Sequence, residues 1–340
     1  MKKKKGTKKL AVAKPKRNNK KKFVSTPKGR FVVASLSALI STGIIGLFLM
    51  YGPITYFREL LITSAMTTIN HKYLATWFYP QETIDYVMSK NTVIEPDANT
   101  NDEQINVSSK ENEMTLTEIS KDGYKGWVLE ISDPSKVILG ISEYFGTKGQ
   151  KMPYFIANYD ALAGINAGGF GDAGGHGNGG LAMGLVISEG KVLKMPKKSS
   201  YDIIGFDYNN VLIIGKYTAS EIEGLNLRDA VEFNPRLIVN GEPATIKGNG
   251  GWGMAPRTAI GQRTDGTVLF VVIDGRSLAS TGVTMKTLQE IMIDLGAYNA
   301  ANLDGGSSTV LYYENEVVNN PSGSDADGMR FLPNAFLVMK

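Results

Sequence analysis

The chain contains no cysteine and only two histidines among its 340 residues. The lack of cysteine excludes a disulfide framework, a zinc site with cysteine ligands and a thiol nucleophile. Because His176 is the only histidine beyond residue 71, a histidine-based zinc site is excluded in the C-terminal part. The GxSxG motif of a nucleophile elbow is also missing, and a Ser-His-Asp triad could use only His176.

Acidic residues are missing from the first 30 positions, which carry 14 lysines and arginines. The remaining 310 residues hold 23 basic and 33 acidic groups, so the net charge of +4 combines a +14 tail with a −10 body. A lysine-rich segment with so few apolar residues cannot bury a core and is predicted to be disordered. An arm that binds nucleic acid is one interpretation of such a segment.

Charge is absent again from residues 31–51, which form an apolar run of 21 residues. About 20 apolar residues span a bilayer as a helix, and flanking positive charge keeps its side in the cytoplasm. A signal peptide has a shorter apolar region of about 7–15 residues. We therefore predict an uncleaved single-pass anchor in the cell membrane, with residues 1–30 as a cytoplasmic tail, an extracellular C-terminal domain and no nucleic-acid partner.

Residues 52–90 are predicted to form a membrane-proximal helical stalk, because apolar residues recur there at near-helical spacing. The stalk lies on the membrane, packs on a partner helix of the cell envelope or packs on its own domain, and the sequence does not separate these alternatives. His71 is interpreted as a surface or packing residue. Residues 91–112 are polar and predict a flexible linker, which leaves 113–340 as one folded domain.

Short β-like runs separated by turn signals dominate the region 113–340. Asn240-Gly241 and Glu189-Gly190 predict hairpins between such runs. A helix is predicted over 285–295 with Thr284 as its N-cap, and weaker helices over 153–160 and 227–233. We therefore expect an α+β fold with a mixed, largely antiparallel sheet and few helices, preceded by one N-terminal transmembrane helix.

Polar residues interrupt the apolar runs at four places. These are Asn166 with the glycines that follow it, Arg257 before an apolar run, Asp274-Gly275-Arg276 and Asp304-Gly305-Gly306 after apolar runs. One Asp-Gly pair at a strand end is usually a turn. Two such carboxylates with two arginines form a fuller set, because guanidinium groups bind phosphate and two carboxylates can divide acid and base roles.

Other motifs in the chain are weak. Residues 169–174 contain GxGxxG, but glycines rather than a helix follow it, so a dinucleotide site is not supported. Asp325 and Asp327 lack the remaining ligands of an EF-hand. No metal or other cofactor is therefore predicted; calcium, which Asp and carbonyl oxygens can bind, has no motif here.

The four segments, in this order, resemble the phosphodiester glycosidase family over roughly residues 119–340. The matching runs are Asn166-Ala-Gly-Gly-Phe170, Pro256–Gly261, Asp274–Arg276, Asn302–Ser308 and Arg330–Ala335, with Ala167 as a departure from the family pattern. The anchored arrangement is similar to that of Gram-positive members described as exopolysaccharide-biosynthesis proteins.

The resemblance implies hydrolysis of a sugar-1-phosphodiester in a phosphorylated cell-surface glycan or glycopolymer. It implies Asp304, Asp274 and Arg257 as catalytic residues. The implied substrate-binding residues are Asn166, Gly168, Gly169, Arg276, Gly305, Gly306, Ser307 and Asn334. The division of roles between the carboxylates, and retention against inversion, stay open.

A second hypothesis is a catalytically silent, membrane-tethered factor that binds or assembles a polysaccharide. The stalk would then carry the function, and the same arginines could bind a polymer.

Overall fold

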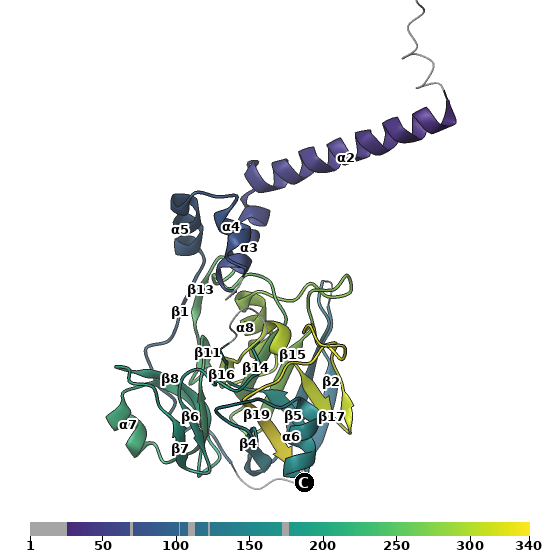
Figure 1. Cartoon of the computed structure of the whole chain (residues 1–340). Coiled ribbons are helices and arrows are strands. Elements are labelled where there is room, and N and C mark those ends of the chain that lie inside the picture. Colours follow the sequence, from purple (N-terminus) through teal and green to yellow (C-terminus); the bar gives the residue numbers. More distant parts are fainter. Residues whose placement is uncertain (1–25, 69–70, 102, 108–112, 122, 172–176) are drawn as a thin grey trace, which may run out of the picture. The chain divides into compact units, whose positions relative to one another are not determined.

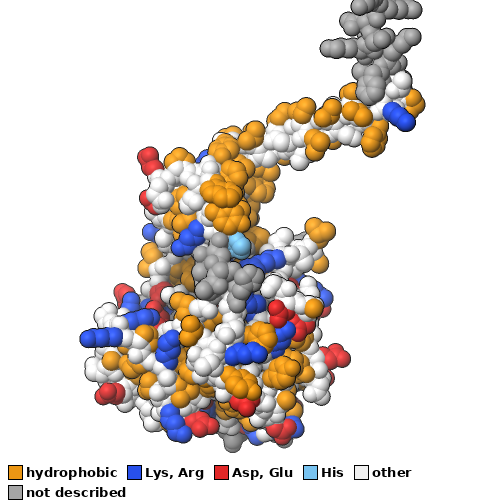
Figure 2. All heavy atoms as spheres, in the orientation of Figure 1, with side chains coloured by type: hydrophobic (Ala, Val, Ile, Leu, Met, Phe, Trp, Pro, Cys, Tyr) orange, Lys and Arg blue, Asp and Glu red, His pale blue; other side chains and the backbone are white. Residues whose placement is uncertain are grey.

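The computed structural model describes residues 26–68, 71–101, 103–107, 113–121, 123–171 and 177–340. The chain divides into two compact units, residues 1–58 and 59–340. The first contains helix α2 (Pro27–Tyr51), whose N-cap Thr26 accepts a hydrogen bond from the Gly29 amide. Helix α2 is long and apolar enough to cross a membrane, and Figure 2 shows hydrophobic side chains along its length.

The second unit contains three sheets and a two-stranded ribbon, and every strand pair described is antiparallel (Figure 1). The α+β prediction with a largely antiparallel sheet is confirmed. The seven-stranded sheet has the order β12 (Glu242–Pro243), β11 (Arg236–Val239), β16 (Asn299–Asn302), β14 (Arg257–Gln262), β15 (Val268–Ile273), β3 (Gly126–Ile131) and β2 (Met114–Glu118).

The other two sheets have five strands each. One has the order β18 (Glu316–Val317), β17 (Leu311–Tyr313), β5 (Ala161–Asn166), β19 (Asn334–Met339) and β4 (Val137–Ile141). The other has the order β7 (Lys191–Lys194), β6 (Val186–Ser188), β10 (Leu227–Glu232), β8 (Tyr201–Asp207) and β9 (Leu212–Tyr217).

The main core lies between these sheets and receives side chains from all three, among them Phe270, Phe336 and Phe206. Strand β15 is buried on both faces. Phe270 and its alternate neighbours enter the main core, whereas Val271 and its alternate neighbours pack with helix α8 (Met285–Asp294) in a second core. Alternation of side chains across a strand explains why this run is apolar without interruption.

Turn and cap predictions agree with the structure at several positions. Thr284 caps α8 by accepting the Thr287 amide at 3.2 Å. The hairpin turns have positive φ at both central residues, with 52° and 73° at Glu189-Gly190 and 54° and 77° at Asn240-Gly241. Such angles match the primed turns that suit twisted antiparallel strands.

The helix predicted over 227–233 is wrong, because these residues form strand β10. Ala230 and Val231 are buried between the neighbouring strands β6 and β8. The side chain of Arg228 donates a hydrogen bond from Nε to Asp229 Oδ2 at 2.8 Å. Tertiary pairing decides the conformation here over a weak local preference. Helix α6 (Met152–Tyr159) agrees with the helix predicted over 153–160, and α7 (Ala219–Gly224) is a further short helix.

The segment before the predicted domain differs from the expected flexible linker. Residues Thr92–Ile94 form strand β1, which pairs with β13 (Thr245–Lys247). Glu95 forms an ion pair with Arg236 at 2.8 Å, and Ile105 is buried in a core cluster. Pairing with a strand about 150 residues away therefore orders residues 92–94, at the start of a segment whose overall composition is polar.

Residues predicted as a stalk form helices α3 (Thr55–Met66), α4 (Tyr73–Thr76) and α5 (Gln81–Lys90). From Glu59 onward they belong to the same compact unit as the sheets. Ile62 and Thr63 on α3 have no exposed surface. Of the alternatives considered for this segment, packing on its own domain is what residues 59–66 show.

Candidate active site

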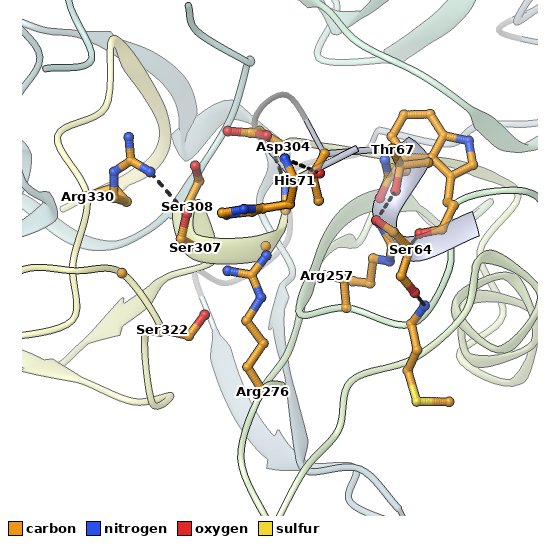
Figure 3. A pocket seen from close by; sticks show the side chains of 18 of the residues that line it. Ser64, Thr67, His71, Arg257, Arg276, Asp304, Ser307, Ser308, Ser322 and Arg330 are labelled. Carbon is orange, nitrogen blue, oxygen red and sulfur yellow. Dashed lines mark hydrogen bonds between the residues drawn. The ribbon is translucent and has the colours of Figure 1, made fainter. Parts of the chain in front are cut away.

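A cavity of about 680 Å³ lies in the second unit (Figure 3). Most of its lining comes from loops at strand ends: 252–257 before and at the start of β14, Arg276 after β15, 302–308 after β16, and 322–330 before β19. Phe170 and Phe233 add aromatic surface. Residues from α3 and α4 and the turn between them form the remaining wall.

The predicted residue Asn166 organises the loop that carries Asp304, although it does not line the cavity. Its side chain is buried at the end of β5. The Asn166 Nδ2 donates to the Asp304 carbonyl, and Oδ1 accepts from Thr258 Oγ1 at 2.7 Å and from the Val310 amide at 3.1 Å. One side chain therefore ties β5, β14 and the 304–310 loop together.

Three further residues that were predicted for the site do not line the cavity either. They are Gly168, Gly169 and Asn334. The Gly168 amide donates to Asn334 Oδ1 at 2.8 Å. A Cβ at Gly168 would lie 3.2 Å from the same oxygen, and one at Gly169 would lie 3.0 Å from the Phe233 ring. These two positions favour glycine because the side chains of Asn334 and Phe233 approach the backbone closely.

Four of the residues named as site candidates line the cavity, namely Asp304, Gly305, Gly306 and Ser307. The Asp304 Oδ1 accepts the Gly305 amide at 3.0 Å. Gly306 has φ 62°, and a Cβ there would lie 3.1 Å from Arg276 Nη2, so the loop and the guanidinium are in close contact. Within the described ranges, Asp304 is the only carboxylate in the cavity lining.

Three arginines, Arg257, Arg276 and Arg330, line the same cavity as this carboxylate. Arg257 is only 4% exposed, and its Nη2 donates to the carbonyls of Trp252 and Gly253 at 2.7 and 3.0 Å. Burial, and then the charge of Arg276, lowers the pKa of Arg257 to about 10. Burial, and then the charge of Arg330, lowers the pKa of Arg276.

Arg330 was absent from the predicted site residues although it lies in the matched C-terminal run. Its Nη1 donates to Ser307 Oγ at 3.1 Å, and its guanidinium lies over the Phe170 ring at 5.2 Å. No ion pair of Arg257 or Arg276 occurs among the residues that the structure describes. Since cations outnumber carboxylates, the cavity is suited to an anion.

Asp274, unlike Asp304, is not among the residues that line the cavity. It is buried, and its Oδ1 accepts the Asn320 amide at 2.8 Å and Asn319 Nδ2 at 3.1 Å. Burial, the largest influence, raises its pKa despite these hydrogen bonds. The carboxylate therefore holds the 319–320 turn and does not line the cavity, in contrast to the catalytic position expected for it.

His71 is exposed, in agreement with the surface or packing position expected for it, and it also lines the cavity. Its amide donates to Thr68 Oγ1 at 3.0 Å, and its ring contacts that of Tyr73. Figure 3 shows its imidazole in the same cavity as Asp304 and Arg276. No local motif signals this position, because it depends on how α3 packs against loops from the other end of the chain. His176 lies outside the described residues.

These features define an anion-binding, carboxylate-containing site on an antiparallel α+β domain. A sequence model of the phosphodiester glycosidase family matches residues 159–339, more than half of the chain. The protein belongs to this family, so the resemblance inferred from the motifs is confirmed.

Individual relatives extend the comparison. A prophage-derived uncharacterized protein of Bacillus subtilis, YomE, is 30% identical over 201 residues, which cover 56% of this chain and 30% of that protein. The chain thus spans about a third of the length of that relative. The zebrafish N-acetylglucosamine-1-phosphodiester α-N-acetylglucosaminidase catalytic domain, auto-inhibited by its pro-peptide, is 18% identical with a TM-score of 0.57, covering 69% of this chain and 86% of its own.

A putative exported protein from Burkholderia pseudomallei is similar over 64% of this chain and 74% of its own, with 17% identity and a TM-score of 0.48. At 18% identity the match to the zebrafish structure shows the fold alone.

Proposed function

We propose that this protein hydrolyses the bond between an anomeric carbon and phosphate in a sugar-1-phosphodiester. The substrate is a phosphorylated cell-surface glycan or glycopolymer, and α2 anchors the enzyme in the membrane with its second unit outside. The observation that carries the proposal is a cavity lined by one carboxylate, Asp304, and by Arg257, Arg276 and Arg330, in a member of this family.

The arginines account for the leaving group. When the bond between the anomeric carbon and the phosphate oxygen breaks, its electron pair goes to the phosphate, which leaves as a phosphomonoester. Arg276 and Arg330 stabilise the developing charge through their N–H groups, and the buried Arg257 adds a fixed positive charge behind them. A phosphate leaving group is already acidic, so a proton donor is less important than in other glycosidases.

Asp304 acts at the anomeric carbon. It serves either as the base that takes a proton from the attacking water or as the nucleophile whose glycosyl ester is then hydrolysed. In both cases water supplies the hydroxyl of the released sugar, and one proton is released to solvent. Asn166 holds Asp304 in place through the backbone carbonyl and takes no part in the chemistry.

The test uses the full chain in detergent with N-acetylglucosamine joined through its anomeric carbon to methyl phosphate. We expect release of N-acetylglucosamine and methyl phosphate, and a loss of about 10³-fold or more in kcat for Asp304→Asn, as for other essential catalytic groups. Asp294→Asn is the matched control, because Asp294 is exposed on α8 and outside the cavity.

Binding of the diester without any release by the wild-type chain would support the silent binding factor instead. Unchanged turnover in Asp304→Asn would remove this residue from the chemistry.

A further inference from the structure

One wall of the cavity is formed by residues within 61–68 and 71–74, which precede the matched family region. Leu61, Ser64, Ala65 and His71 are among its lining residues. The family match begins only at residue 159. Because these lining residues lie outside the matched family region, the segment either covers the site or contributes to its function.

Helix α3 is joined to the 249–254 loop by specific contacts. Thr63 Oγ1 accepts from Asn249 Nδ2 at 2.9 Å, and Ser64 Oγ accepts from the Met254 amide at 3.2 Å. Gly253, with φ 58°, lies so close to α3 that a Cβ there would be 2.2 Å from Ser64 Oγ and 2.4 Å from its Cα. The helix and the loop are thus packed together with no space for a side chain.

The same loop holds Arg257. The carbonyls of Trp252 and Gly253 accept both hydrogen bonds from Arg257 Nη2, and the third bond of this guanidinium, from Nε, goes to Val283. Since Arg257 has no carboxylate partner among the described residues, these carbonyls determine where its charge lies. A displacement of α3 would therefore move the loop and, with it, the guanidinium.

The wall leaves the cavity open. The residues of α3 that line it are mostly small, such as Ser64 and Ala65, and about 680 Å³ remains beside them. The His71 side chain lies in the same cavity as Asp304 and Arg276 (Figure 3). An imidazole at this place can donate a hydrogen bond to a phosphate oxygen or a sugar hydroxyl.

We propose that residues 61–68 and 71–74 contribute to the active site. Thr63 and Ser64 are positioning residues that place Arg257 for phosphate through the 249–254 loop, and His71 contacts the substrate. The inference rests on the proposed function for its substrate. It assigns the start of the catalytic unit to the segment near residue 59 and not to residue 113.

The experiment measures binding of inorganic phosphate to the full chain by calorimetry, together with kcat and KM for the diester. Thr63→Val removes the acceptor of Asn249 with little change in size, and Thr63→Ser retains it. We expect Thr63→Val to weaken phosphate binding and raise KM about tenfold, the effect of one misplaced charge-assisted hydrogen bond. Thr63→Ser is expected to restore both values.

Two further variants complete the test. Thr76→Val is the control, because Thr76 is an exposed helical threonine outside the cavity. His71→Asn is expected to lower kcat/KM for the diester about tenfold or more, as a lost substrate hydrogen bond would. Circular dichroism and the midpoint of unfolding establish that each variant is folded under assay conditions.

The outcomes separate the two proposals. If the wild-type chain binds phosphate but turns over no diester, and Thr63→Val weakens the binding, the positioning inference holds and the proposed function fails. Equal phosphate affinity in wild type and Thr63→Val would overturn the inference, as would the absence of phosphate binding. An increase in kcat/KM in Thr63→Val or His71→Asn would overturn it too, because the segment would then be an inhibitory cover.

Discussion

Replacement of Arg276 by glycine is predicted to make the protein more stable and less active. Arg276 has φ 59°, in the left-handed region, and burial lowers its pKa. A left-handed residue with a side chain costs about 1–2 kcal/mol, and glycine costs about 0.5–1 kcal/mol through its freedom in the unfolded chain. The free energy of unfolding should therefore rise by about 0.5–1 kcal/mol.

The effect on activity has the opposite sign. The guanidinium lines the cavity and has no carboxylate partner among the described residues, so its hydrogen bonds are available for phosphate. One charge-assisted hydrogen bond contributes about 1.5–3 kcal/mol, which corresponds to a loss of about 10- to 150-fold in kcat/KM. A residue kept in a strained conformation for binding should show this pair of effects.

The assay combines urea unfolding, followed by circular dichroism, with initial rates of phosphomonoester release. Glu189→Gly is the matched control, because Glu189 has φ 52° in an exposed hairpin turn away from the cavity. It should gain comparable stability with unchanged kcat/KM. The reasoning would be refuted if Arg276→Gly kept wild-type kcat/KM, or if its free energy of unfolding fell by more than about 1 kcal/mol, the size of the expected strain relief.

Two further predictions concern Asp274 and Tyr217. Asp274→Asn keeps an acceptor for Asn319 and Asn320, and burial already disfavours the charge of the carboxylate. The free energy of unfolding should therefore change by less than about 1 kcal/mol, and kcat/KM by less than about fivefold. A loss of about 100-fold in kcat/KM in a folded variant would show that Asp274 takes part in the chemistry. Burial raises the pKa of Tyr217 to about 12, above the 10 of an exposed phenol, so its contribution is complete below pH 10 and is lost as pH rises toward 12. Between pH 8 and pH 11 wild type should lose about 1.4 kcal/mol more than Tyr217→Phe in urea unfolding, and equal losses would contradict the assignment.

Much of the fold could be predicted because its signals are local. The apolar runs of β15 and β19, the Asn-Gly and Glu-Gly turns and the cap of α8 each depend on neighbouring residues. Strand β10 was mistaken for a helix because its conformation depends on β6 and β8, and β1 was missed because its partner β13 lies far along the chain.

The site was predicted in part for a similar reason. Asp274 and Asp304 have the same local pattern, an apolar strand followed by glycine, and their strands both border β14. Only the fold shows that the Asp274 carboxylate accepts a hydrogen bond from the Asn320 amide, whereas the Asp304 carboxylate lines the cavity. The position of His71 depends on the packing of α3 against the 249–254 loop, which leaves no pattern in the sequence.

The cavity contains side chains from Ser64 on α3 and from Arg330 just before the last strand. The site can therefore form only after nearly the whole second unit has been synthesised. At about 5–20 residues per second, the interval between these two positions is roughly 13–53 seconds. For this time the growing chain holds α3 without the complete set of loops that line the cavity. The set of arginines that line the cavity is complete only when Arg330 has been added, so activity reports that synthesis has reached the last strand of the second unit and that this unit has folded.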